Sequence, residues 1–266
     1  MLADDAVDLV YIATPHAFHG EQIRLCASYG RAVLCEKAFT GNARQAREAL
    51  AFAEEKRVPV TEAIWTRYMP SRAMIDRVIA DGTLGEVRLL QANLCYDVQK
   101  KERILRPELA GGALLDLGGY TLNFAMMAMG DALTDVQSLV RMLPTGCDLE
   151  ETIRLTWQNG VTGTLLSSAV CRSDRRGIIY GTKARLEVDN INNPQVLTIW
   201  DTQDHLLETI SVPKQITGYE YEVEAALRML DEGRLECPEM PHAETIRMME
   251  LMDSLRRDWG MVYPFD

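Results

Sequence analysis

The stretch "AVLCEKAFT", residues 32–40, decides how the first part of this chain is built. Its apolar residues Ala32 to Cys35 predict a buried strand, which ends at the adjacent charges Glu36 and Lys37. In open α/β sheets, ligands bind at the carboxyl ends of the strands. Lys37 is therefore either a surface charge or a catalytic group.

The segments on either side of this strand alternate between strand and helix patterns. Residues 7–14 and 58–65 are rich in β-branched and aromatic residues, whereas 15–30 and 42–57 carry apolar residues at helical spacing. The first 66 residues therefore run β-α-β-α-β with short links. This order predicts a parallel sheet with helical crossovers.

Beyond residue 66 the pattern changes to closely spaced strands with a few helices. Strand-like segments lie at 86–98, 135–143, 151–160, 161–171, 176–190, 195–201 and 206–213. Strands in succession favour an antiparallel sheet, and Asn159-Gly160 suits a type I′ hairpin turn. We therefore predict an α/β protein with two domains. Residues 1–66 form a Rossmann-like, doubly wound parallel sheet, and residues 67–266 form an α+β domain with an open, mainly antiparallel sheet.

Composition excludes several classes of function. The net charge of −11 argues against a nucleic-acid or anionic-membrane partner, because either would be repelled. The apolar runs are too short for a membrane span, and the acidic first residues do not look like a signal peptide. The six cysteines are scattered with no C-x-x-C pair, which argues against a metal site or a disulfide framework and indicates a cytoplasmic protein.

The stretch "GGALLDLGGYTLNF", residues 111–124, contains the most unusual chemistry. Asp116 and Tyr120 are four residues apart and share one face of a helix. Gly118 and Gly119 lie between them, and each costs ~1 kcal/mol relative to alanine in a helix interior. The glycines would let a flat ligand or a neighbouring backbone approach. The alternative is tight helix packing, with Asp116 as a cap and Tyr120 half-buried.

Lys37 and Tyr120 together would form an acid/base pair. A lysine ammonium nearby lowers a tyrosine pKa from its usual value of about 10. Such a pair exchanges a proton with an alcohol or a carbonyl near neutral pH. If the fold joins them, we expect both groups to face one cleft between the domains, in direct or water-mediated hydrogen-bond reach.

The chain resembles the Gfo/Idh/MocA family of nicotinamide-dependent oxidoreductases, and within it the dimeric dihydrodiol dehydrogenases. The resemblance lies in "AVLCEKAF", "EAIWTRYMP", "DGTLGEVR", "GGALLDLGGY" and "GTKARLEV", which keep their order and spacing. It implies that Lys37 matches the Glu-Lys-Pro lysine and Tyr120 the proposed acid/base tyrosine. It further implies that Asp116 and Trp65 help to shape the substrate site.

The resemblance also implies a cofactor site and a reaction. The residues placed near the cofactor are Thr14, Pro15, His16, His19, Glu36, Lys37, Trp65 and Arg67. The implied reaction is hydride transfer between NADP or NAD and a secondary alcohol of a sugar or a trans-dihydrodiol. Three alternatives stay open: both histidines as turn residues with satisfied backbone bonds, Arg67 as an interdomain salt bridge, and Trp65 as core.

A homodimer is expected through the faces of the antiparallel sheet. The helices available are too few to cover both faces, so one face must meet water or another chain. The strand segments at 152–157, 162–170 and 196–200 are too apolar for a wholly solvated face. The resembling branch of the family implies the same assembly.

Two departures from the family pattern matter. Ala38 replaces the proline of Glu-Lys-Pro, and we expect no cis bond there because a non-proline cis bond costs ~2.5–4 kcal/mol. Lys37 would then point differently. No G-x-G-x-x-G turn precedes Val7, so roughly two βα units, ~60 residues at about 30 each, are expected to be missing from a truncated sheet.

The missing turn predicts weak cofactor binding. Two or three lost hydrogen bonds to the pyrophosphate remove roughly 3–9 kcal/mol, a factor on the order of 10² to 10⁶ in affinity. An inactive remnant that serves as a dimeric binding or scaffold protein is therefore an alternative to the dehydrogenase. A start codon placed too late is another.

Overall fold

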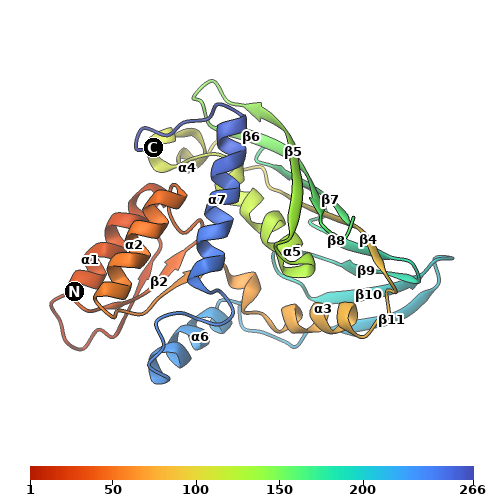
Figure 1. The fold of residues 1–266 in the computed structure, drawn as a ribbon, viewed down its shortest axis with the longest axis horizontal. Coiled ribbons are helices and arrows are strands. Elements are labelled where there is room, and N and C mark those ends of the chain that lie inside the picture. Colours follow the sequence, from red (N-terminus) through yellow and green to blue (C-terminus); the bar gives the residue numbers. More distant parts are fainter.

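The computed structural model describes residues 1–266 and contains two β-sheets with helices packed against them (Figure 1). The small sheet has the order β1-β2-β3, and both of its pairings are parallel. Its strands are β1 (Leu9–Ile12), β2 (Ala32–Glu36) and β3 (Val60–Ala63). This confirms the parallel sheet expected from the alternating strand and helix patterns.

Helices cover both faces of the small sheet. The connections contain the 3-10 turn η1 (His16–Phe18) and the helices α1 (His19–Ser28) and α2 (Ala43–Glu55). The Asn42 side chain caps α2 by accepting the Gln45 amide at 2.9 Å. On the other face, Ala226 of α6 (Glu220–Asp231) packs against Leu34 and Ala63. A later segment of the chain therefore completes the core of the first sheet.

The large sheet has eight strands in the order β11-β10-β9-β8-β4-β7-β6-β5. Its strands are β4 (Val87–Cys95), β5 (Leu133–Met142), β6 (Asp148–Trp157), β7 (Thr162–Ser168), β8 (Gly177–Gly181), β9 (Ala184–Val188), β10 (Val196–Asp201) and β11 (Leu206–Ser211). Only β4 and β7 pair in parallel, so the sheet is mainly antiparallel as predicted. Segment 176–190, expected as one strand, forms the hairpin β8–β9.

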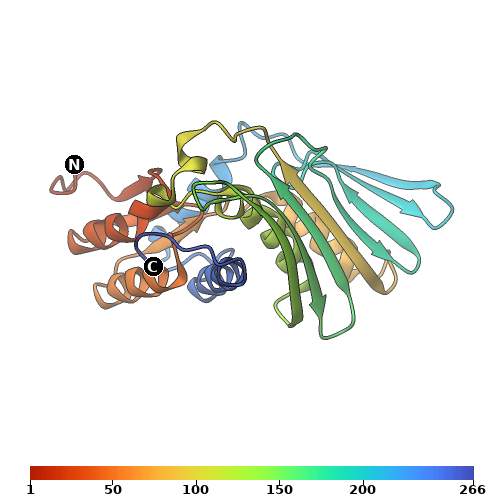
Figure 2. The same ribbon diagram turned by 90° about the horizontal axis from the view of Figure 1, so that it is seen from above.

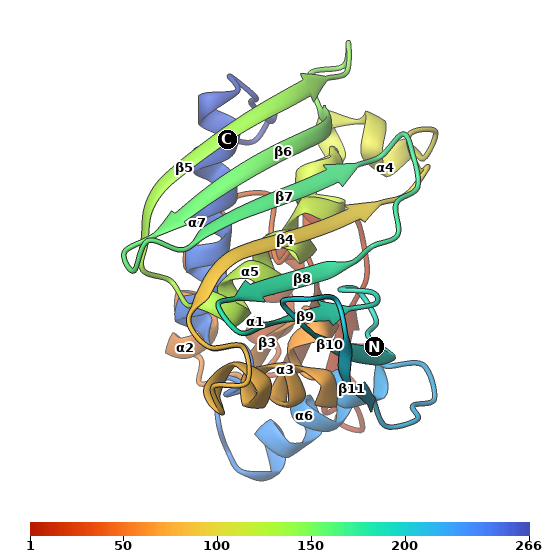
Figure 3. The same ribbon diagram turned by 90° about the vertical axis from the view of Figure 1, so that its right-hand side faces the viewer.

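Helices cover one face of the large sheet, and the other face is open (Figure 3). The covering helices are α3 (Pro70–Ala80), α5 (Gly119–Met129) and α7 (His242–Asp258). Seen from above, the small sheet and the large sheet lie at opposite ends, with α7 between them (Figure 2). Each helix is either too short or too polar to span a lipid bilayer.

The open face is more polar than expected at β6 and β7. Ile153, Leu155 and Leu165 are buried beneath the sheet, whereas Thr152 and Arg154 alternate with them and are exposed. The apolar residues of these strands therefore mostly serve the core. The exposed exceptions include Leu89, Leu139 and Leu166.

The hairpin between β6 and β7 is present, but the predicted type I′ turn is wrong. A type I′ turn needs positive φ at both central residues, and here only Gly160 has it, at 82°. Trp157 and Val161 pair across the loop, with the Trp157 amide donating to the Val161 carbonyl at 2.9 Å. The loop therefore has three residues, with the glycine at its left-handed position.

Candidate active site

The predicted site residues follow the carboxyl ends of the three parallel strands. Thr14 to His16 come after β1, Lys37 comes directly after β2, and Trp65 comes after β3 in the 3-10 turn η2 (Trp65–Arg67). Parallel strands place their carboxyl ends at one edge of a sheet. The sheet therefore gathers these three segments along one edge.

Lys37 binds the segment that carries Asp116 and Tyr120. Its Nζ donates to the Asp116 carbonyl at 2.8 Å and to Asp116 Oδ1 at 3.3 Å. The same Nζ lies 5.0 Å from the centroid of the Tyr120 ring. The Lys37–Ala38 bond is cis, so the expectation that alanine would leave it trans is wrong.

The helix that carries Asp116 begins with a π-helical turn, η4 (Leu114–Gly118), which continues into α5. Asp148 caps this turn by accepting the Leu114 amide at Oδ2, at 2.6 Å. A Cβ on Gly118 would lie 2.5 Å from Glu151 Oε1. Glycine at 118 therefore makes room for a buried carboxylate of β6, which matches the packing alternative and not the approach of a ligand.

Arg103, which sequence reasoning missed, completes the surroundings of Asp116. It lies on the short helix α4 (Glu102–Leu105), between β4 and the π-helical turn. Its Nη2 donates to Asp116 Oδ2 at 2.8 Å and its Nε to Oδ1 at 3.3 Å. Burial alone would raise the pKa of Asp116, but the charges of Lys37 and Arg103 outweigh it and lower that pKa, which keeps Asp116 an anion.

Tyr120 is half-buried and differs from the expectation in one respect. Burial and the negative charge of Glu36 raise its pKa well above the usual value, whereas we expected Lys37 to lower it. The reason is geometric, because Lys37 approaches the face of the ring and no hydrogen bond joins it to the hydroxyl. In the chain without ligands the phenol is therefore protonated at neutral pH.

Both histidines after β1 bind backbone carbonyls. His16 Nδ1 lies 3.2 Å from the Ala110 carbonyl, and burial together with Lys37 lowers its pKa to about 3. His19 lies between the Ala38 carbonyl (3.0 Å from Nδ1) and the Thr14 carbonyl (2.7 Å from Nε2). His19 thus connects the turn after β1 to the chain after β2. This matches the alternative in which the histidines are turn residues that bond the backbone.

The other residues of the turn after β1 have local roles. The Thr14 hydroxyl donates to Gln22 Oε1 at 2.7 Å. Pro15 precedes η1 as its N-cap residue and provides no side-chain cap. These contacts shape the turn and leave its place at the sheet edge unchanged.

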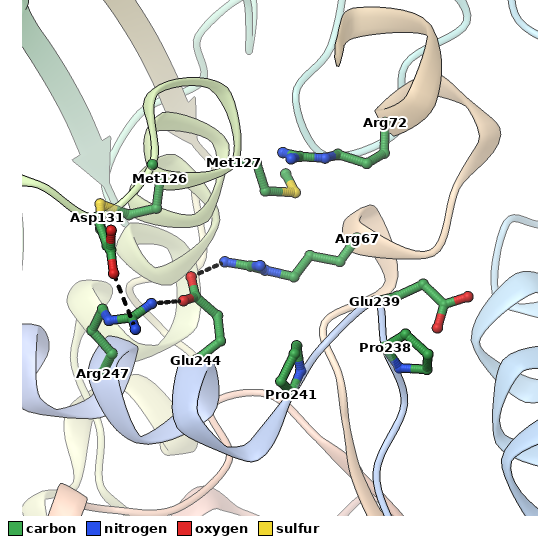
Figure 4. Close-up of a pocket in the computed structure, with 11 residues that line it drawn as sticks. Arg67, Arg72, Met126, Met127, Asp131, Pro238, Glu239, Pro241, Glu244 and Arg247 are labelled. Carbon is green, nitrogen blue, oxygen red and sulfur yellow. Dashed lines mark hydrogen bonds and ion pairs between the residues drawn. The ribbon is translucent and has the colours of Figure 1, made fainter. Parts of the chain in front are cut away.

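Trp65 and Arg67 separate in space. The Trp65 ring stacks on Tyr219 at 4.3 Å, and its Nε1 donates to Asn192 Oδ1 at 3.1 Å. Arg67 instead extends between two helices, where it donates to Asn123 of α5 at 2.6 Å. It also donates to Glu244 of α7 at 2.5 Å (Figure 4). Arg67 therefore lines a different cavity, of about 480 Å³. It forms a salt bridge with Glu244, and both residues lie within 67–266, so this is not the interdomain bridge of the alternative.

Glu36 has a second acid beside it that the sequence did not reveal. Glu36 accepts hydrogen bonds from the Tyr11 hydroxyl and from the Lys37 amide. Glu222 of α6 is buried nearby, and burial together with Glu36 raises the pKa of Glu222 to about 8. Tyr219, Glu222 and Asn192 lie far along the chain in segments without motifs, so no sequence signal pointed to them.

The arrangement can supply a proton and stabilise a negative charge. A protonated phenol lies next to an ammonium group, and Asp116 fixes that ammonium. Arg103 holds Asp116 from the other side through two guanidinium nitrogens. A carbonyl oxygen placed beside the phenol could take its proton, with the ammonium stabilising the phenolate left behind.

Two family models match the chain in sequence order. Residues 1–64 match the model described as "Oxidoreductase family, NAD-binding Rossmann fold", and residues 73–187 match "GFO/IDH/MocA C-terminal domain". The chain is 31% identical over 274 residues to the scyllo-inositol 2-dehydrogenase (NADP(+)) of Bacillus subtilis, covering all of this chain and 82% of that protein. It is 30% identical over 269 residues to the human trans-1,2-dihydrobenzene-1,2-diol dehydrogenase, covering 99% and 80%.

Solved structures show the same fold. The 3-ketoreductase KijD10 from Actinomadura kijaniata, in complex with NADP and TDP-benzene, matches with a TM-score of 0.88 and 25% identity, over 96% of this chain and 79% of that one. Variants of that protein with a substituted lysine or tyrosine match as well. The aldose-aldose oxidoreductase of Caulobacter crescentus matches in fold, with a TM-score of 0.87 at 19% identity over 96% and 78% of the two chains.

Proposed function

Because the chain belongs to the Gfo/Idh/MocA family of nicotinamide-dependent oxidoreductases, we propose that it transfers hydride between NADP or NAD and a secondary alcohol of a sugar or a trans-dihydrodiol. The substrate class follows the relatives, which are an inositol dehydrogenase and a dihydrodiol dehydrogenase. One observation carries the proposal: Asp116 fixes the Lys37 ammonium 5.0 Å from the centre of the Tyr120 ring. Lys37, Tyr120 and Asp116 are the proposed catalytic residues.

The residues at the sheet edge fit a nicotinamide dinucleotide. The carboxyl ends of three parallel strands meet there, which is where doubly wound sheets bind dinucleotides. The turn from Thr14 to His16, Glu36 and Lys37 would hold the nicotinamide end, and Trp65 would form a wall shared with the substrate. We leave Arg67 out because Glu244 and Asn123 engage its guanidinium. When bound, the cofactor supplies or accepts the hydride.

The protein's own residues would handle the proton. In the reducing direction, the protonated Tyr120 donates to the oxygen of the substrate carbonyl. The Lys37 ammonium stabilises the resulting phenolate, because opposite charges a few ångströms apart attract strongly in a partly buried site. Asp116 holds Lys37 in place and, with Trp65, orients the substrate. The oxidation of the alcohol follows the same steps in reverse.

Two further parts of the proposal concern organisation. We divide the chain at residue 66, which agrees with family matches at 1–64 and 73–187. We also propose a homodimer through the open face of the large sheet. Leu89, Leu139 and Leu166 lie exposed on that face and support this contact.

The test compares two tyrosine variants. Tyr120→Phe should lower kcat by about 10²-fold or more, the usual contribution of a general acid, and leave the affinity for NADPH unchanged. Tyr180→Phe is the matched control, since Tyr180 lies on β8 and its hydroxyl bonds Gln91 at 3.2 Å. Both are assayed in the reducing and oxidising directions with an inositol and a trans-dihydrodiol.

Two outcomes would contradict the proposal. Equal activity of the Tyr120→Phe variant and the wild type would remove Tyr120 from the chemistry. A wild-type chain that binds NADPH and stays inactive with every polyol would instead favour the scaffold alternative.

A further inference from the structure

Two cysteines lie together at the carboxyl end of β4, outside the candidate active site. All six cysteines are free thiols, and Cys171 is the exposed one. Cys95 is the last residue of β4 and is buried. Cys171 follows β7, which is the parallel neighbour of β4.

The backbone holds the loop that carries Cys171 against Cys95. In the parallel register Cys95 is opposite Ser168, and the Tyr96 amide donates to the Ser168 carbonyl at 3.0 Å. Further along the loop, the Cys95 amide donates to Ser173 Oγ at 3.1 Å, and the Ser173 amide donates to the Cys95 carbonyl at 3.4 Å. The loop is therefore bonded beside Cys95 at both ends, with Cys171 between them.

The two thiols are neighbours, and one of them is open to solvent. Burial raises the pKa of the Cys95 thiol to about 11, and the adjacent Ser173 and Cys171 also act on it. Cys171 and Ser168 line a surface cavity of about 450 Å³ at the edge of the open sheet face. Leu139 and Leu166 of the proposed dimer contact line the same cavity. In the single subunit a small oxidant therefore reaches Cys171 first, with Cys95 behind it.

We propose that Cys95 and Cys171 are an oxidant-sensitive thiol pair that forms an intramolecular disulfide. With hydrogen peroxide, the Cys171 thiolate attacks one oxygen, the S–O bond forms, the O–O bond breaks, and water leaves once the hydroxide is protonated. The Cys95 sulfur then attacks the resulting sulfenic acid, the S–S bond forms, the S–O bond breaks, and a second water leaves. The two thiols lose two electrons, and the peroxide is reduced to two waters.

The experiment reads the bond directly and does not depend on the proposed dehydrogenase. The reduced protein is treated with a small excess of hydrogen peroxide, alkylated and digested with trypsin without reduction. Trypsin separates the two thiols into peptides 89–100 and 155–172, each with one cysteine. We expect these peptides to appear joined by a disulfide, and the titratable thiols of the denatured protein to fall from six to four.

Three variants complete the test. Cys171→Ser should abolish the joined peptide, and Cys95→Ser should stop at a sulfenic acid on Cys171 that dimedone traps. Cys237→Ser, at a buried thiol near Met229, should leave the joined peptide unchanged. Oxidation of Cys171 to a sulfinic acid in the wild type, with Cys95 still titratable, would overturn the proposal. So would a disulfide between two chains. The wild-type peptide map decides the first outcome and non-reducing gel electrophoresis of the undigested wild type decides the second, even if a variant fails to fold.

Discussion

Gly118 and Gly119 should respond in opposite ways to replacement by alanine. Both have helical backbone angles, so the substitution tests only the space beside each residue. At Gly118 the new Cβ would lie 2.5 Å from Glu151 Oε1 and 3.0 Å from Leu114 Cδ1. At Gly119 the nearest side-chain atom is Met252 Sδ at 3.8 Å, an ordinary contact.

The expected magnitudes follow from two opposing effects. Alanine stabilises a helix interior by ~1 kcal/mol relative to glycine, at either position. Overpacking costs about 1–3 kcal/mol, and it applies only at Gly118, because Glu151 is 2% exposed and has little space to move. Gly118→Ala should therefore lower the free energy of unfolding by up to ~2 kcal/mol, while Gly119→Ala raises it by up to ~1 kcal/mol.

Urea denaturation followed by tryptophan fluorescence measures the difference. The two midpoints should move to opposite sides of the wild type. In a Glu151→Ala background the penalty of Gly118→Ala should shrink, because the clashing carboxylate is gone and only the 3.0 Å contact with Leu114 Cδ1 remains. Shifts of the same sign at both glycines, or a Gly118→Ala penalty of the same size without Glu151, would refute the packing argument.

The remaining predictions concern charge, assembly and the cofactor. Glu222→Gln should stabilise the protein by several kcal/mol between pH 6 and 9. The pKa of Glu222 in the folded protein is raised to about 8, so the wild type loses stability as the pH rises from about 4.5 towards that value. Thermal melts across this range should therefore show a melting temperature that depends less on pH for the variant. Arg103→Gln should lower kcat/KM by about tenfold or more by releasing Asp116, with partial rescue by Arg103→Lys; unchanged kinetics would show that Lys37 alone fixes Asp116. Sedimentation at micromolar concentration should give a dimer that Leu139→Glu dissociates, and a wild-type monomer would count against the open face as an interface. Titration calorimetry of the 266-residue chain with NADP should give binding weaker than micromolar; tighter binding would show that the sheet edge holds the cofactor without a glycine-rich turn.

The sequence predicted most helices and strands well, because the spacing of apolar residues and the turn residues between them depend only on neighbouring positions. The apolar run that ends at Lys37 located the sheet edge, since a parallel strand delivers its next residue there. The hairpin turn was misassigned because its loop length depends on the pairing of Trp157 with Val161, which a dipeptide does not specify. Pairing across the sheet is a tertiary property that overrides local turn preference.

The missed residues share a cause. Arg103 comes from a short helix in a connecting segment, and Glu222 comes from a helix whose amphipathic pattern makes it look like an ordinary surface element. At Gly118 the choice between ligand approach and helix packing stays open in the sequence, because its neighbour, Glu151, lies on a strand that begins later in the chain. The spacing of residue types in a single sequence does not indicate which distant segments contact each other.

The way α7 joins the two sheets also has a consequence for the order of folding. Asp253 of α7 accepts the Ala43 amide across 210 positions, and Glu244 binds Arg67 across 177. During synthesis, Lys37 and Asp116 therefore leave the ribosome long before α7, the helix that packs between the two sheets. Closing such long loops is entropically costly and slows folding. We expect a nascent chain halted before α7 to form the strands of both sheets but no rigid Lys37–Asp116 contact. The candidate site would then be among the last features to form.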